Sequence, residues 1–291
     1  MAMNLSILRT RTLSAAVFVV IMLVGLLWNQ WSFFVLFSII HFGCWNEYQK
    51  IIALIDKDYA TITPFHRYGV MLAGWCLMLY FMNEHYRIGT ASLHRIGWWA
   101  GLALLFVLPV LEIILSRKLQ LKNIGYSILG LLYISLPWGL FTNLRTVGFG
   151  SFDRLGKLLV LLIIATIWIN DTMAYMVGSW IGRTPFSKIS PKKTWEGTIG
   201  GIVLAVVVIG VLAYFFGYPD GRGNWIIIGD WLLLGAVVSI TGTLGDLLES
   251  KLKRMAGVKD SGHLMPGHGG FLDRFDSMLL AIPFGWMIMM L

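Results

Sequence analysis

The stretch "EGTIGGIVLAVVVIGVLAYFFG", residues 196–217, contains a single charged side chain, Glu196. A membrane-spanning helix needs roughly 17–25 predominantly apolar residues, so this stretch predicts a transmembrane helix. The whole chain of 291 residues agrees with that prediction, because 57% of it is hydrophobic and only 13% is charged. A soluble domain would be roughly a quarter charged. We therefore predict an all-α integral membrane protein.

Eight further apolar segments lie on either side of this stretch, and each has the composition of a membrane span. They lie near 12–28, 31–46, 68–83, 97–116, 124–143, 157–181, 225–248 and 272–291. The second segment is short for a span. The first is too long for a removable signal peptide and lacks a small-residue cleavage site. The sequence thus predicts a polytopic bundle of about nine transmembrane helices.

The distribution of Lys and Arg predicts how the bundle is oriented. With the N-terminus in the cytoplasm and nine alternating helices, 17 of the 23 Lys and Arg residues fall on the cytoplasmic side and 6 on the other. Cytoplasmic loops carry such an excess. We expect a multi-pass protein of the cell inner (cytoplasmic) membrane, with its N-terminus in the cytoplasm and its C-terminus outside. The net charge of +8 follows from the same rule, so no nucleic-acid partner is expected.

The eighth apolar segment ends in the polar stretch "TGTLGDLLESKLKRMAG", residues 241–257. Asp246, Glu249, Ser250 and Lys253 follow i, i+3, i+4, i+7 spacing, so they share one helix face. A carboxylate at membrane depth costs a few kcal/mol unless it is paired, hydrated or bound to metal. The Glu249–Lys253 pair fits a solvated helix end. Asp246 lies inside the apolar run, which favours a functional role.

A second polar stretch, "KDSGHLMPGHGGFLDRFDS", occupies residues 259–277. Asp273 and Asp276 open the last apolar segment one turn apart, and the helix dipole explains one of them. Together with Asp246 they would converge on one cation, and oxygen ligands favour Mg²⁺ over zinc. The two histidines of this loop lack zinc-site spacing, so we expect them to form loop hydrogen bonds.

The third polar stretch, "SPKKTWEG" at 190–197, precedes the seventh apolar segment. Lys192 and Lys193 there mark either an anion site at a helix start or simple topological charge. Asp171, with Tyr175 one turn later, lies inside the sixth segment and is a functional candidate. Pairs of glycines at GxxxG spacing predict close helix packing: Gly178 with Gly182, and Gly197 with Gly201. These features predict a half-buried cytoplasmic site for a metal-bound polyanion, shared with a lipid.

Residues 250–277 resemble the signature of the phosphatidate cytidylyltransferases, also called CDP-diacylglycerol synthases. The resemblance extends over about 165–280, including "GDLLES" and "NDTMAYMVGSWIGRTPFSKISPKKTWEG". The N-terminal half is similar only in consisting of hydrophobic helices. The signature is carried by Ser250, Lys251, Lys253, Arg254, Lys259, Asp260, His268, Gly269, Gly270, Asp273, Arg274 and Asp276.

The resemblance implies that the protein makes CDP-diacylglycerol and pyrophosphate from CTP and phosphatidate. It implies a membrane-lipid environment, a homodimer, a polar cavity facing the cytoplasm, and Mg²⁺, with a second cation left open. It also implies N-terminal helices over 1–156 and a catalytic region over 157–291. Metal binding is implied for Asp246 and Asp273, and catalytic roles for these two with Lys259, Asp276 and Arg274. Substrate binding is implied for Lys193, Lys192, Ser250, Lys253, Arg254, Asp260, His268, Gly269, Gly270 and Asp171.

The residue types fit this chemistry. A phosphate monoester is largely ionised at pH 7, so it needs no general base to act as a nucleophile. Cations reduce the repulsion between two anions and stabilise the leaving pyrophosphate. The alternatives are a cytidylyltransferase for another lipid phosphate and a cation-coupled transporter. A transporter predicts repeated halves with broken helices, whereas the polar residues here lie on one side.

Overall fold

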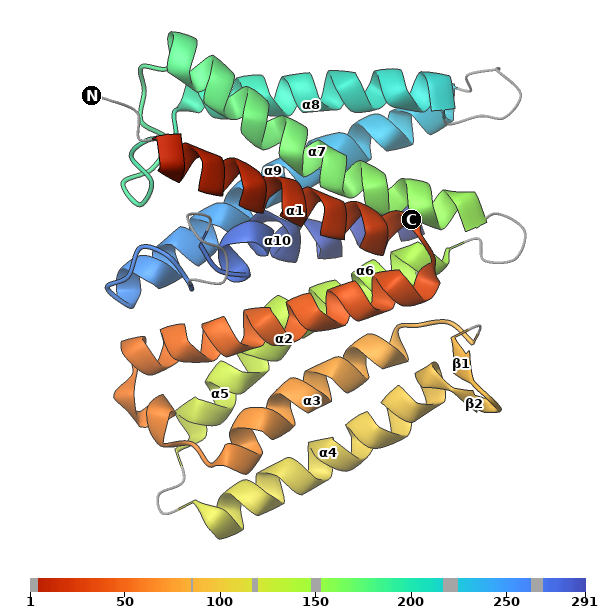
Figure 1. The fold of residues 1–291 in the computed structure, drawn as a ribbon, viewed down its shortest axis with the longest axis vertical. Coiled ribbons are helices and arrows are strands. Elements are labelled where there is room, and N and C mark those ends of the chain that lie inside the picture. Colours follow the sequence, from red (N-terminus) through yellow and green to blue (C-terminus); the bar gives the residue numbers. More distant parts are fainter. Residues whose placement is uncertain (1–4, 85, 117–119, 148–152, 217–224, 263–268) are drawn as a thin grey trace. The chain divides into compact units, whose positions relative to one another are not determined.

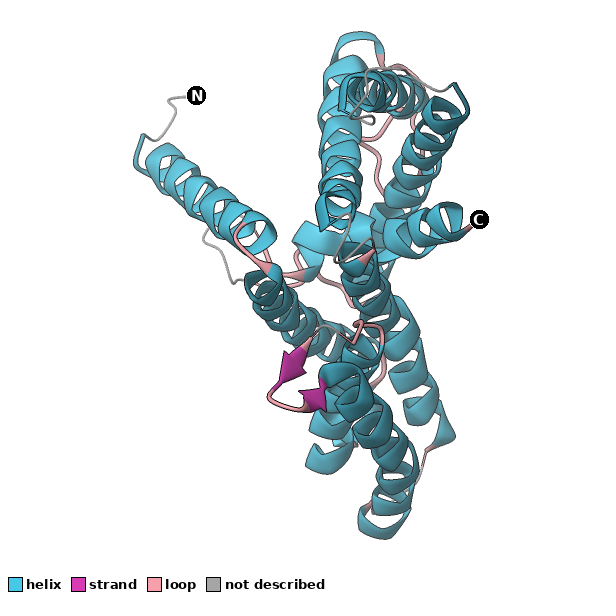
Figure 2. Cartoon of the chain, turned by 90° about the vertical axis from the view of Figure 1, so that its right-hand side faces the viewer, coloured by secondary structure: helices cyan, strands magenta, loops and turns pink. Residues whose placement is uncertain are grey.

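The computed structural model describes residues 5–84, 86–116, 120–147, 153–216, 225–262 and 269–291, and these are almost entirely helical (Figures 1 and 2). Each of the nine apolar segments expected from the sequence overlaps described helix over most of its length. In chain order the elements are α1 (Leu5–Leu27), α2 (Gln30–Ile55), η1 (Lys57–Thr61), α3 (Pro64–Tyr80), β1 (Arg87–Ile88), β2 (Ala91–Ser92), α4 (Leu93–Leu115), α5 (Leu121–Gly130), η2 (Leu131–Ser135), α6 (Leu136–Thr146), α7 (Asp153–Ile181), α8 (Trp195–Phe216), α9 (Trp225–Met255) and α10 (Leu272–Met290).

Five helices in the described part of the chain are long and apolar enough to cross a membrane. They are Leu93–Leu115, Leu121–Thr146, Leu155–Ile181, Trp195–Phe215 and Ile228–Met255. The sequence-based expectation of an all-α, multi-pass membrane protein is therefore confirmed. Crossing by α1, α2, α3 and α10 stays a prediction.

The chain divides into two compact units. The first contains Met1–Lys157 and Leu252–Phe275, and the second contains Leu158–Lys251 and Asp276–Leu291. The first cut falls beside the 156/157 boundary expected from the sequence. However, the described part of 252–275, which carries most of the signature, belongs to the same unit as the N-terminal helices. The assignment of catalysis to 157–291 stays a prediction.

In the first unit, α2 is longer than the 31–46 segment expected from the sequence. It starts after Asn29, whose side chain caps the helix by accepting hydrogen bonds from the amides of Trp31 and Ser32 at 2.8 Å. It then continues to Ile55. The expected end was wrong because two polar residues just beyond 46, Glu47 and Gln49, are buried with protein partners. Gln49, for example, donates to the carbonyl of Arg67 at 2.9 Å.

The helices α5 and α6 join through the π-helical turn η2 and act as one long helix. Pro137 follows this turn. Proline has no amide proton and disturbs the helical hydrogen-bond ladder, and a π turn accommodates the disturbance. The turn includes Ser135, whose hydroxyl accepts from Trp45 Nε1 at 2.8 Å and lies 3.0 Å from His41 Nε2. The irregular turn therefore connects this helix to α2.

A buried polar cluster connects α3, α4 and α5. His66 Nε2 lies 2.7 Å from Ser127 Oγ, and His66 Nδ1 lies 3.5 Å from Glu112 Oε1. Glu112 also accepts a hydrogen bond from the Thr63 hydroxyl at 2.6 Å. Because buried polar groups need such partners, each member of this cluster restrains its own helix.

In the second unit, small residues let the helices approach closely. A Cβ atom added at Gly197 of α8 would lie 2.8 Å from the Cα of Gly178 in α7. The helix-packing role predicted for the glycines is confirmed for Gly178, Gly197 and Gly201, whereas Gly182 follows the end of α7 and lies against the Thr194 side chain. In addition, the Asn170 amide of α7 donates to the Thr243 hydroxyl of α9 at 3.2 Å. These contacts position the α7, α8 and α9 side chains that line the cavity described next.

Candidate active site

The second unit contains a cavity of about 460 Å³, and most of the residues that line it are polar or charged. It is lined by α7, the loop before α8, and the helices α8 and α9. Four candidates from the sequence, Asp171, Lys192, Lys193 and Asp246, share this cavity. The complete lining is Asn170, Asp171, Ala174, Tyr175, Gly178, Ser179, Ser190, Lys192, Lys193, Thr194, Thr198, Thr243 and Asp246.

A cation and a carboxylate meet in this cavity. Lys193 Nζ forms an ion pair with Asp246 Oδ2, and the two side chains are 26% and 28% exposed. Ser250, one turn after Asp246 on α9, donates its hydroxyl to Asp246 Oδ1 at 3.2 Å. Because both charged groups remain partly accessible, an incoming anion or cation can contact them directly.

The loop that carries Lys193 is held by backbone and side-chain contacts. Glu196, in the first turn of α8, accepts hydrogen bonds from the amides of Arg183 and Thr184 at 3.2 Å. The Phe186 amide donates to the carbonyl of Lys193 at 2.8 Å. The loop therefore closes on itself and presents its lysines from an ordered backbone.

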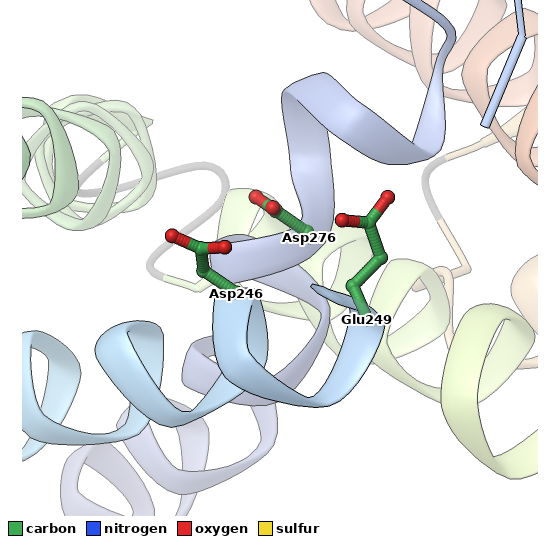
Figure 3. Close-up of side chains that lie close together, drawn as sticks. All are labelled: Asp246, Glu249 and Asp276. Atoms are coloured by element: carbon green, nitrogen blue, oxygen red, sulfur yellow. The ribbon is translucent and has the colours of Figure 1, made fainter. Parts of the chain in front are cut away.

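Three carboxylates of the second unit lie close together (Figure 3). Asp246 and Glu249 extend from α9 and Asp276 from α10, and one ligand oxygen of each lies within 4.8 Å of the others. Glu249 is fully buried, so the expectation that it is a solvated helix-end charge was wrong. Oxygen donors at this spacing fit a hard divalent cation such as Mg²⁺ better than a soft metal.

Asp273 belongs to the first unit and lies in a different environment. Lys253 Nζ donates to its Oδ1 at 2.6 Å. The amides of Ser261 and Gly270 donate to its Oδ2 at 2.8 Å. Two signature residues, Lys253 and Gly270, are thus brought to Asp273. In these contacts Asp273 holds the described ends of the loop between α9 and α10, residues 256–262 and 269–271, which we call the signature loop. The expected role of Asp273 as a metal ligand stays a prediction.

Most of the other charged signature residues lie at the surface. Arg254, Lys259, Asp260 and Arg274 have exposed side chains. Gly269 has φ +81°, a left-handed conformation that favours glycine. His268 and the neighbouring His263 lie outside the described residues.

Three polar residues that organise the two loops were not among the candidates from the sequence, and Glu249 was assigned there to a solvated helix end. Glu196 holds the lysine loop, and Glu249 completes the carboxylate cluster. Glu47 of α2 and Ser261 hold the signature loop, with their side chains 2.7 Å apart. The spacing of Glu249 from Asp246 was visible in the sequence. The role of Glu47 was not, because it depends on residues more than 200 positions away.

Fold and site together define a helical membrane protein whose second unit contains a lysine–aspartate cavity and a cluster of three carboxylates. The sequence model of the cytidylyltransferase family matches residues 9–291. Because this match covers nearly the whole chain, the protein belongs to the cytidylyltransferase family.

Individual relatives agree with this assignment. The chain is 50% identical over 129 residues to the phosphatidate cytidylyltransferase of Synechocystis sp., covering 44% of this chain and 42% of that protein. It is 34% identical over 224 residues to the phosphatidate cytidylyltransferase of Bacillus subtilis, covering 77% of each chain. It is 36% identical over 200 residues to that of Haemophilus influenzae, covering 66% of this chain and 65% of the relative. The aligned stretches thus span between 42% and 77% of these relatives' lengths.

Proposed function

We propose that this protein transfers a cytidylyl group from CTP to phosphatidate, producing CDP-diacylglycerol and pyrophosphate for phospholipid synthesis. The observation that carries the proposal is a lysine–aspartate cavity next to a carboxylate cluster in a chain of the cytidylyltransferase family. The relatives' names supply the substrates. A membrane protein suits this reaction because one substrate is held in the bilayer and the other is dissolved in water.

The chemistry is a direct in-line displacement. A phosphate oxygen of phosphatidate attacks the α-phosphorus of CTP, a new P–O bond forms, and the bond to the β-phosphate oxygen breaks to release pyrophosphate. The attacking phosphate is already ionised, so it has no proton to give up. Lys192 and Lys193 bind phosphate oxygens of CTP and reduce the repulsion between the two anions. No enzyme nucleophile is needed.

A divalent cation, Mg²⁺ in our proposal, would be held by carboxylates of the second unit. Asp246, Glu249 and Asp276 offer the clustered oxygens. When bound, such an ion stabilises negative charge on phosphate oxygens. The family resemblance implies Asp273 as a metal ligand in addition to Asp246. A second cation is also part of the proposal.

The other signature residues bind substrate in this proposal. Lys259, Arg254 and Arg274 are exposed cations suited to phosphate oxygens. Ser250 orients Asp246. The remaining candidates for substrate contacts are Lys253, Asp260, His268, Gly269, Gly270 and Asp171.

The assembly and orientation are also proposals. We propose a homodimer, which the family resemblance implies. We also propose that it lies in the cell inner membrane with a cytoplasmic N-terminus, an external C-terminus and a cavity facing the cytoplasm, and the excess of Lys and Arg on one side supports this orientation. Cysteines introduced at 182–197 and 255–270, without Cys44 and Cys76, should escape an impermeant thiol reagent in intact cells. A cysteine at Gly221 should be labelled. Labelling of the first two regions from outside would overturn the orientation.

The function is tested by incubating purified protein with radiolabelled CTP, phosphatidate and Mg²⁺. We expect a labelled CDP-lipid and loss of the product with a chelator. Parallel reactions with other lipid phosphates separate the proposed substrate from a related one. Formation of product only with another lipid phosphate would redirect the substrate assignment, and cation flux in liposomes without any CDP-lipid would favour a transporter.

Direct transfer has its own test. Initial rates should give intersecting double-reciprocal lines, because both substrates bind before reaction, whereas a covalent route gives the parallel lines of ping-pong kinetics. Configuration at an α-thio-labelled phosphorus should invert once. Retention of configuration would indicate a cytidylyl-enzyme and exclude single displacement.

A further inference from the structure

A carboxylate from the N-terminal helices holds the start of α10. Glu47, in α2, has only 5% of its surface exposed. Its Oε1 accepts a hydrogen bond from the amide of Phe271, and its Oε2 accepts one from the amide of Leu272, both at 2.9 Å. The first amides of a helix have no partner within that helix. Glu47 therefore caps α10 from a helix more than 200 residues away in the sequence.

The local shape is built around this contact. Gly43 lies one turn before Glu47 on α2, and a Cβ atom there would collide with the ring of Phe271. Cβ atoms added at Gly262 or Gly270 would collide with the Glu47 carboxylate itself. Glycine at these three positions lets the signature loop close on α2. The glycines therefore have a structural reason that does not involve a phosphate.

The contact continues from Glu47 to Asp273. The hydroxyl of Ser261 lies 2.7 Å from Glu47 Oε2 and 2.9 Å from Asp273 Oδ2. Asp273 is also bound by Lys253. All these residues belong to the first unit. A displacement of the Glu47 carboxylate would therefore move Ser261 and the first turn of α10, and with them two charged residues of the signature.

We propose that Glu47 is a positioning residue for cytidylyl transfer, contributed by the N-terminal helices, which fixes the signature loop so that Asp273 and Lys253 keep their places. The inference rests on the proposed function, since that function gives the signature its catalytic role. Glu47 need not contact substrate. It acts by accepting hydrogen bonds from the Ser261 hydroxyl and from the amides of Phe271 and Leu272. Few other side chains could accept all three, because a carboxylate has two acceptor oxygens and no donor.

The test compares Glu47→Gln with Glu112→Gln in the full-length protein in detergent. Both carboxylates are buried in the first unit, but the described partners of Glu112 are His66 of α3 and Thr63, the residue that caps α3. In Glu47→Gln, one carboxylate oxygen is replaced by an NH₂ group, which is a donor and would face a backbone amide that also donates. We expect kcat to fall about 10- to 100-fold, as misplacement of catalytic groups does. We also expect the KM for CTP to change less than about threefold. Glu112→Gln should leave the kcat of folded protein unchanged.

Amide hydrogen exchange gives a second readout that does not depend on activity. In Glu47→Gln the amides of Phe271 and Leu272 should exchange at least about tenfold faster than in the unmodified protein, because their acceptor is disturbed. Glu112→Gln should leave them protected. If Glu47→Gln cannot be purified folded, Ser261→Ala removes the hydroxyl link alone and should lower kcat in the same direction.

Each outcome decides the inference. An unchanged kcat for Glu47→Gln, or an equal loss in Glu112→Gln, would overturn the positioning role. Unchanged exchange at Phe271 and Leu272 would also overturn it. If the unmodified protein forms no CDP-lipid, the proposed function fails, and with it the positioning role in that reaction. The exchange measurement still decides whether Glu47 holds the loop.

Discussion

Glu47 and Asp246 are both carboxylates on long helices of a membrane protein, but they have opposite surroundings. Glu47 receives three hydrogen bonds, two of them from backbone amides. Asp246 faces two further carboxylates within 4.8 Å and an ion-paired lysine in an accessible cavity. Donors stabilise a buried carboxylate, whereas clustered like charges favour a bound cation. The neighbours of a carboxylate, more than its depth, therefore separate a structural role from a role in the site.

The largest effect should come from the carboxylate cluster. We expect Asp246→Asn to lower kcat by about 10³-fold or more, because the charge that binds the cation is lost. Asp230→Asn is the matched control, since Asp230 lies on the same helix with an exposed side chain. Both variants are assayed for CDP-lipid at equal membrane content. Similar activities for the two would remove Asp246 from the site.

The next effect separates the two aspartates of α10. Asp276 lies in the described cluster, whereas Asp273 is held by Lys253 and Ser261. If Asp276 is a ligand, Asp276→Asn should raise the Mg²⁺ concentration for half-maximal rate about tenfold, equivalent to roughly 1.4 kcal/mol. Titration of Asp273→Asn with Mg²⁺ is the companion measurement. A shift only in Asp273→Asn would favour the ligand pair that the family resemblance implies.

A smaller effect is expected at the lysine loop. Lys193→Ala should raise the KM for CTP about tenfold, because a hydrogen bond to a charged group contributes about 1.5–3 kcal/mol. Lys188→Ala is the control, since Lys188 is exposed on the same loop but does not line the cavity. Equal KM values for both variants would mean that Lys193 does not bind CTP and contributes only to the positive charge that orients the protein in the membrane.

The smallest effect on activity should come from the polar cluster of α3, α4 and α5. Glu112→Gln weakens the contacts of Glu112 with His66 and Thr63. We expect it to lower the free energy of unfolding by about 1–3 kcal/mol, with normal activity of the folded protein. Thermal unfolding in detergent measures the loss. A drop in kcat without a drop in stability would mean that this cluster also serves the reaction.

The sequence predicted the helices well because a membrane span is a contiguous run of apolar residues, which can be read from the local composition. It placed the end of α2 nine residues too early because Glu47 and Gln49 look like an aqueous boundary until their buried partners are known. It grouped Asp171, Lys193 and Asp246 in one polar site, and the structure brings them to one cavity. The side of the membrane that this cavity faces stays a prediction. The Glu47 contact could not be predicted, because no local spacing records a partner 214 residues away.

The long separation between Glu47 and its donors also has a consequence for biosynthesis. Ser261 is made 214 residues after Glu47, which is roughly 10–40 s at about 5–20 residues per second. During that interval α2 contains a carboxylate whose native donors do not yet exist. We expect nascent chains that stop before residue 259 to be degraded faster than the complete chain, which pulse-chase labelling would measure. Equal lifetimes would show that the newly inserted helices tolerate Glu47 without its final partners.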